Sequence, residues 1–155
     1  MGKYIFDNLK DWGIVLEKLE ELSKSKNLGN HQEELIRLLR FNDNWRLREA
    51  AIESLHAIEA PSFELIREVF RLVMREDLYY DVRILATDSL EKLFINLLQR
   101  KNVDVENTIP LASEIIDGME RSLASPQPPI FYNALQKSLK QISHSVVCRA
   151  TSLDA

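Results

Sequence analysis

The chain has 155 residues, of which 45% are hydrophobic and 28% are charged, and its formal net charge at pH 7 is −4. This length and composition are typical of one soluble globular domain and argue against intrinsic disorder as the overall state. The acidic balance gives the protein no general attraction to nucleic acid or to an anionic membrane.

Apolar residues recur at spacings of three and four along the whole chain, and no stretch shows the strict alternation of a half-buried strand. The sequence therefore predicts an all-α protein. Cap and turn residues divide it into about seven helices, which we place at residues 7–26, 31–41, 44–59, 62–75, 81–101, 108–124 and 130–147.

Polar residues predict how the first two helices begin. Asp7 or Asn8 can cap the first helix, because either side chain can accept a hydrogen bond from the first turn. Asn30 with Glu33 forms a capping-box-like start for the second helix.

The later breaks depend on turn residues and proline. Asn44 and Ser62 are the predicted N-caps of the third and fourth helices. Pro110 falls in the first turn of the predicted sixth helix, where proline is tolerated. Ser125–Pro129 then forces the break before the seventh helix.

One segment occurs twice, thirty-five residues apart, at Leu47–Ile58 and Val82–Leu93. A third, degenerate copy lies at Phe131–Ile142. Such self-similarity is typical of stacked helical repeats, in which each unit buries its apolar face against its neighbours. We therefore expect a single domain over residues 1–148. It would contain a capping helix (7–26), helix pairs at 31–59, 62–101 and 108–147, and a disordered tail at 149–155.

The repeated segments resemble HEAT repeats. In Asp43–Leu55 and Asp77–Leu90, a turn Asp precedes Leu-Arg or Val-Arg, and Ala and Leu follow at helical spacing. The period is shorter than the roughly 40–47 residues of HEAT units in general and is similar to short HEAT-like repeats of bacterial proteins. The resemblance implies a right-handed α-solenoid, an armadillo-like superhelix. It also implies a structural ladder between neighbouring repeats, formed by Asp43, Arg48, Asp77 and Arg83.

In such an array the second helix of each pair lines the concave side, where partners usually bind. We call the outward positions of these helices the ridge: Glu49, Glu53, His56, Asp81, Ile84, Asp88, Glu91, Lys137 and Lys140. The ridge is acidic in two repeats and basic in the third, so it favours a protein partner with a basic surface. A solvated charged face without a partner is the alternative interpretation.

Trp12 and Trp45 lie beside apolar stripes and are predicted to pack in the core.

One pattern on the ridge could bind a metal. Glu53-x-x-His56 and Asp88-x-x-Glu91 would offer four ligands across two helices, and the HEAT-like deoxyhypusine hydroxylases are di-iron enzymes. Those enzymes use His-Glu pairs in several repeats, which this chain lacks. We therefore predict no enzyme activity, no metal and no cofactor.

Cys148 is the single cysteine, which excludes an intramolecular disulfide and a cysteine-based zinc site. It lies four residues after His144, but a nucleophile would also need an orienting third group. The N-terminus lacks a secretory signal, and no apolar run approaches the roughly 20 residues that span a bilayer. We expect a cytoplasmic protein without a membrane or lipid anchor.

Two further resemblances define alternative functions. HEAT-like alkylpurine DNA glycosylases bind DNA, and Arg67, Arg71 and Arg75 align along one helix face. Glu64 and Glu68 interleave with them, so internal ion pairs are the favoured interpretation, and nucleic acid is disfavoured. HEAT-like bilin lyases are the second alternative, and no residue pattern here specifies a tetrapyrrole pocket. The sequence leaves a monomer and a homodimer open.

Overall fold

The computed structural model describes residues 10–154. Within them the chain forms seven α-helices, two short 3₁₀ turns and no strand, so the prediction of an all-α protein of about seven helices is confirmed. The elements are α1 (Trp12–Lys24), η1 (Leu28–His31), α2 (Gln32–Leu39), α3 (Trp45–Ser54), η2 (Leu55–Ala57), α4 (Phe63–Met74), α5 (Tyr80–Leu98), α6 (Val105–Leu123) and α7 (Pro129–Asp154).

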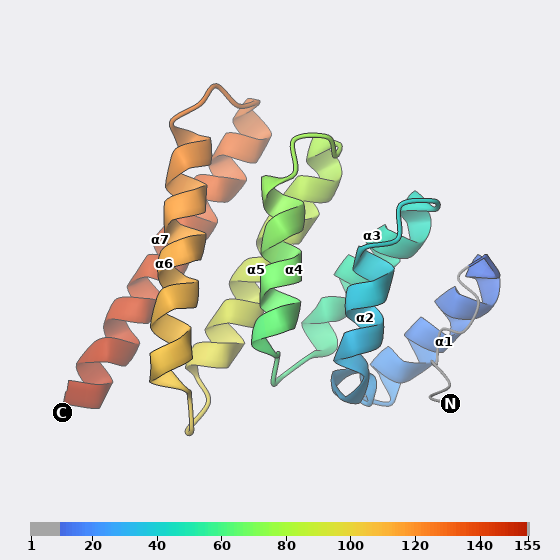
Figure 1. The fold of residues 1–155 in the computed structure, drawn as a ribbon, viewed down its shortest axis with the longest axis horizontal. Coiled ribbons are helices and arrows are strands. Elements are labelled where there is room, and N and C mark those ends of the chain that lie inside the picture. Colours follow the sequence, from blue (N-terminus) through green and yellow to red (C-terminus); the bar gives the residue numbers. More distant parts are fainter. Residues whose placement is uncertain (1–9, 155) are drawn as a thin grey trace.

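The helices form two layers, as Figure 1 shows. The first layer contains α2, α4 and α6, and the second contains α1, α3, α5 and α7, with each helix packed on the next in its layer. The hairpins α2–α3, α4–α5 and α6–α7 connect the layers. Because α1 packs on α3, it extends the second layer. The described chain therefore begins at one end of the row and finishes at the other (Figure 1).

The core lies between the layers and contains the repeated apolar positions. All of the following are buried: Leu47, Ala51, Leu55 and Ile58 in the first copy; Val82, Ala86, Leu90 and Leu93 in the second; Phe131, Leu135 and Ile142 in the third. Leu139, which aligns with Leu55 and Leu90, is only half-buried and packs against the core. The main role of the repeated apolar residues is therefore to form the core.

Two predicted N-caps are confirmed. Asn44 Oδ1 accepts a hydrogen bond from the Arg46 amide at 2.9 Å, and α3 begins directly after this cap. Ser62 Oγ accepts from the Leu65 amide at 3.2 Å at the start of α4. Caps of this kind satisfy amides that have no partner inside the helix. The predicted cap at Asp7 or Asn8 lies outside the described residues.

Two predicted helix starts are wrong. Residues 28–31 form the 3₁₀ turn η1, so α2 begins at Gln32 and has no side-chain cap, in place of the expected capping box of Asn30 and Glu33. The sixth helix begins earlier than expected, at Val105, because Asp104 Oδ1 caps the Asn107 amide at 3.3 Å. Pro110 consequently lies inside α6 and not in its first turn.

The seventh helix is longer than predicted. It continues to Asp154, whereas the sequence suggested an end near Val147 and a disordered tail from residue 149. No glycine or proline follows Pro129, so nothing interrupts the helix. Arg149 also fastens it, because its Nη2 donates to the Arg100 carbonyl after α5 at 3.1 Å.

Gln32 joins two hairpins on the side opposite the α2–α3 turn. Its Nε2 donates to the Gly29 carbonyl at 3.0 Å and to the Ala60 carbonyl at 2.9 Å, while its Oε1 accepts from the Ser62 amide at 2.7 Å. The amide group thereby satisfies three backbone groups in the segments that enter α2 and α4. The pattern of apolar residues carried no sign of this contact.

Candidate functional site

The ridge lies on the exposed side of the second layer. Six of its residues are exposed: Glu53, His56, Asp81, Asp88, Lys137 and Lys140. Glu49, Ile84 and Glu91 are half-buried, and none of the nine is buried. The second layer thus presents the six exposed side chains to solvent from α3, η2, α5 and α7, whereas Ile84 packs against the core and Glu91 Oε1 is buried.

The carboxylates of the ridge take no part in salt bridges within residues 10–154. The salt bridges that connect helices lie in the first layer instead. Arg40 Nε is 3.0 Å from Glu68 Oε2 and joins α2 to α4, and Arg67 Nε is 3.5 Å from Glu114 Oε2 and joins α4 to α6. Among the described residues, no salt bridge therefore neutralises the acidic charge of the ridge.

The arginines of the nucleic-acid alternative are paired with carboxylates. Arg71 Nη1 lies 3.2 Å from Glu68 Oε2, as the helical spacing predicted. Arg67 pairs with Glu114 of α6 and not with Glu64. Arg75 pairs with Asp77 at 2.6 Å. A duplex would have to compete with these internal partners for each of the three cations.

Two of the expected ladder residues, Arg48 and Asp77, are connected between the turns through Asn42 and Arg75, which the sequence did not predict. Arg48 Nη1 donates to Asn42 Oδ1 at 3.0 Å, and Arg75 Nη1 donates to the same oxygen at 3.3 Å. Arg75 Nη2 then donates to Asp77 Oδ2 at 2.6 Å. Neighbouring hairpins are thus joined at their turns through Asn42 and Arg75, whereas Asp43 is exposed.

Charges in this network alter pKa values. Hydrogen bonds from Arg75 lower the pKa of Asp77, and the same contact raises the pKa of Arg75. Burial lowers the pKa of Arg48, and the neighbouring positive charge of Arg75 lowers it further. Since arginine remains protonated in proteins and the pKa of Asp77 is depressed, all three groups are ionised at neutral pH.

Arg83 is buried and makes contacts to three helices. Its Nε donates to the Val73 carbonyl of α4 at 2.9 Å. Its guanidinium carbon lies 4.3 Å from the ring centroid of Phe131 in α7 and 5.3 Å from that of Tyr80 in α5. Burial lowers its pKa. The contacts of Arg83 are thus with a carbonyl and two rings, whereas the resemblance implied a ladder that includes Asp77.

Trp12 and Trp45 are exposed, so the prediction that they pack in the core is wrong. Trp12 is 45% exposed and Trp45 is 58% exposed. Each is the first residue of its helix, where the ring projects beyond the core. Together with Asp43, Asn44 and Arg46 they line an open hollow of about 360 Å³. The Arg46 guanidinium carbon lies 5.6 Å from the Trp45 ring centroid.

A second open hollow, of about 300 Å³, lies between the same two helices. Its lining comes from Leu16, Leu19, Glu20 and Ser23 of α1 and from Ala50, Glu53, Ser54 and His56 of α3 and η2. Trp12, Leu16, Leu19 and Ser23 follow one another at helical spacing, so both hollows lie along one line. We call this combined feature the α1–α3 groove.

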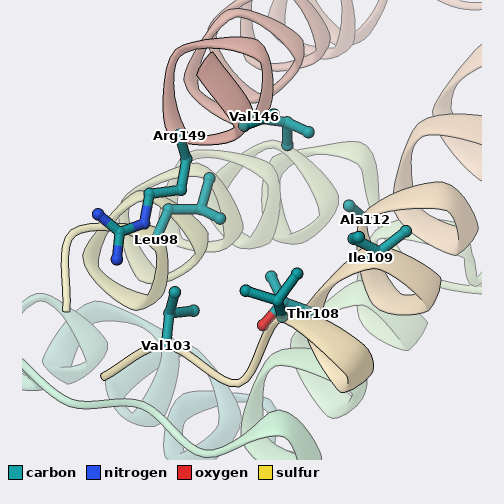
Figure 2. Close-up of a pocket in the computed structure, with 9 residues that line it drawn as sticks. Leu98, Val103, Thr108, Ile109, Ala112, Val146 and Arg149 are labelled. Carbon is teal, nitrogen blue, oxygen red and sulfur yellow. The ribbon is translucent and has the colours of Figure 1, made fainter. Parts of the chain in front are cut away.

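A third pocket lies at the other end of the molecule, between the α5–α6 loop, α6 and α7 (Figure 2). Leu98, Val103, Ile109 and Val146 give it an apolar lining, and Arg149 lies at its edge. Its volume is about 60 Å³, well below the roughly 300–1,000 Å³ typical of small-molecule sites. Apart from Thr108 and Arg149, the side chains that line it are apolar.

The described part of the chain holds no cluster of side chains that could bind a metal ion. No three His, Cys, Asp or Glu side chains there lie close enough together to hold a metal ion, and this includes Glu53, His56, Asp88 and Glu91. Cys148 Sγ lies 3.5 Å from His144 Nε2, with both side chains exposed on α7. No helix among residues 10–154 is long and apolar enough to cross a membrane.

Comparison with models of protein families, with curated proteins and with solved structures finds no match to this chain.

Proposed function

We propose that this protein is a non-enzymatic protein-binding module, a short right-handed α-solenoid of HEAT-like repeats that binds its partner on the second layer. The order of the hairpins, the two layers and the buried repeat positions all support this architecture. In such a solenoid the second layer is the concave side, and α1 lengthens it by one helix beyond the three repeats.

The observation that carries the proposal is the state of the ridge carboxylates. Glu49, Glu53, Asp81 and Asp88 are at least partly exposed and take no part in salt bridges within the described residues. Unneutralised carboxylates aligned on one face attract a basic surface and accelerate its approach. Lys137 and Lys140 give the α7 end the opposite sign, so the partner would be oriented as well as attracted.

The other two functions gain no support from a specific contact. DNA binding of the alkylpurine glycosylase type would need the arginines of α4, which are paired with carboxylates. A bilin would need a pocket much larger than the one at α6 and α7, whose volume is about 60 Å³. A protein partner needs only an exposed surface with complementary charge, which the ridge supplies.

The test is an affinity pull-down from lysate of the native host with two variants of equal charge. In the ridge variant, Glu49, Glu53, Asp88 and Glu91 are replaced by Lys. In the control variant the same change is made at four exposed carboxylates of the first layer: Glu33, Glu64, Asp117 and Glu120. Circular dichroism first checks that both variants keep the helical content of the wild type.

We expect one protein to be captured by the wild type and by the control variant and to be lost from the ridge variant. Its capture should also weaken as salt is raised, because exposed charges are screened beyond about 8–10 Å at physiological ionic strength. Equal capture by both variants would show that the ridge is not the binding surface. Recovery of nucleic acid alone would favour the DNA-binding alternative.

A further inference from the structure

We propose that the α1–α3 groove binds an amphipathic helix of the partner protein, with aliphatic side chains on one face and lysine or arginine beside them. This inference rests on the proposed function and specifies where on the second layer the partner is anchored. The groove lies at the α1 end of the second layer, and α1 is the helix that the sequence predicts as the N-terminal capping helix.

The groove has the composition of a helix-binding surface. Its floor is formed by Leu16 and Leu19 of α1 and by Ala50 of α3, and its upper end by the two tryptophans. The lining of α3 and η2 extends from Trp45 to His56, which at 1.5 Å per residue is roughly 16 Å, or three helical turns. A bound helix would place apolar residues at i, i+3 or i+4, and i+7 along this length.

The backbone of the groove favours a helix over an extended peptide. Beyond their first turns, α1 and α3 have amides and carbonyls that are already hydrogen-bonded within each helix. An extended segment buried there would leave its own backbone groups without partners, which costs free energy. A helix satisfies its backbone internally and can bury its side chains at no such cost.

The charge of the groove selects a basic partner. Asp43 lies at the tryptophan end and Glu53 at the other end, and neither takes part in a salt bridge within residues 10–154. Glu20 is paired with Lys24 at 2.8 Å, and Arg46 lies against the Trp45 ring. The lining therefore holds three carboxylates, those of Glu20, Asp43 and Glu53, against the single guanidinium of Arg46. Lysine or arginine beside the apolar face of the incoming helix would complement this excess of negative charge, above all at Glu53.

The probe is a synthetic 14-residue helical peptide with leucine at i, i+3, i+4 and i+7 positions and lysine elsewhere, labelled with fluorescein for anisotropy. One control peptide replaces every lysine by glutamate, and another keeps the composition but scatters the leucines around the helix. Trp12 and Trp45 are the chain's two tryptophans, and both line the groove, so their emission reports binding independently of the label.

The full-length protein should bind the probe with one-to-one stoichiometry, shift its tryptophan emission and ignore both control peptides. Trp45→Ala should weaken binding by roughly tenfold or more, as removal of a buried interface tryptophan does. The ring is exposed in the free protein, so its removal should leave the fold intact. Glu53→Lys should weaken binding by about fivefold and reduce its salt dependence.

The matched control is Tyr79→Ala, which removes an equally prominent exposed aromatic residue from the start of α5, outside the groove. It should change the affinity less than twofold. The proposal is overturned if Tyr79→Ala weakens binding as much as Trp45→Ala, or if the glutamate peptide binds as well as the lysine peptide. A wild-type dimer in sedimentation that Trp45→Ala dissociates would also overturn it, with a second copy as the occupant.

The two proposals can fail separately. If the probe does not bind but lysate capture still depends on the ridge, the helix proposal alone is wrong. If the probe binds the groove but capture is indifferent to the ridge, the ridge proposal is wrong and the groove is the site to pursue.

Discussion

At the scale of single residues, the arginines show how the same side chain can have different roles. Arg83 is 3% exposed and holds a carbonyl of α4 and rings of α5 and α7 together, whereas Arg46 stacks on an exposed tryptophan at the surface. The energetic value of a cation–π contact rises when water is excluded, so these two contacts should differ in strength.

We expect Arg83→Ala to lower the free energy of unfolding by about 3 kcal/mol, because it leaves the Val73 carbonyl without its donor and a cavity beside Phe131. Arg46→Ala is the matched control and should cost less than about 0.5 kcal/mol. Urea denaturation followed by circular dichroism measures both. A cost below about 1 kcal/mol for Arg83→Ala would show that the contacts are not stabilising.

At the scale of helices, close packing in the first layer depends on Gly118. A Cβ atom at this position in α6 would overlap the Phe70 ring of α4 and would approach Met74 Sδ to 3.3 Å. The missing side chain therefore lets α4 and α6 come together. Neither the local pattern nor the helix propensity of glycine indicates this role.

Two effects of opposite sign decide the outcome of Gly118→Ala. Alanine favours a helix interior by about 1 kcal/mol over glycine, but overpacking a core typically costs about 1–3 kcal/mol. Since Phe70 is buried and its ring is rigid, we expect a net loss of about 1 kcal/mol in unfolding free energy.

The same denaturation experiment in a Phe70→Leu background tests the cause of that loss. There the overlap is absent, and Gly118→Ala should become neutral or stabilising. A stabilising effect of Gly118→Ala in the wild-type background would mean that the two helices can separate without cost.

At the scale of the whole molecule, the row of helices gives unequal support to its members. α5 packs on α3, α4 and α7, whereas α1 packs on α3 and the short turn η1. In repeat proteins the stability of each unit depends on the contacts with its neighbours. The centre of the row should therefore be the most stable part.

We expect amide hydrogen exchange to be slowest in α4 and α5 and fastest in α1, because α1 can open by losing one helix–helix interface. Mass spectrometry of peptides from the exchanging protein measures this gradient. Equal protection in all helices would instead indicate a single cooperative unit.

Local chemistry made the helices and core predictable from the sequence. The side chains of Asn44 and Ser62 cap helices by accepting hydrogen bonds from amides two and three residues further along the chain. The repeated apolar residues are buried, as their spacing predicted. These features depend on neighbours along the chain. The exposure of the ridge also followed from helical spacing, since an outward position on a packed helix is set by its core positions.

Contacts between segments distant in sequence were decided only by the tertiary structure. Arg75 joins Asn42 across thirty-three residues, Gln32 bonds to Ala60, and α1 lies beside α3 in the second layer. The exposure of Trp12 and Trp45, and thus the α1–α3 groove, depends on that placement. Periodicity shows which face of a helix is apolar, but which helix covers that face, and how far the cover extends, is determined by packing of the whole chain.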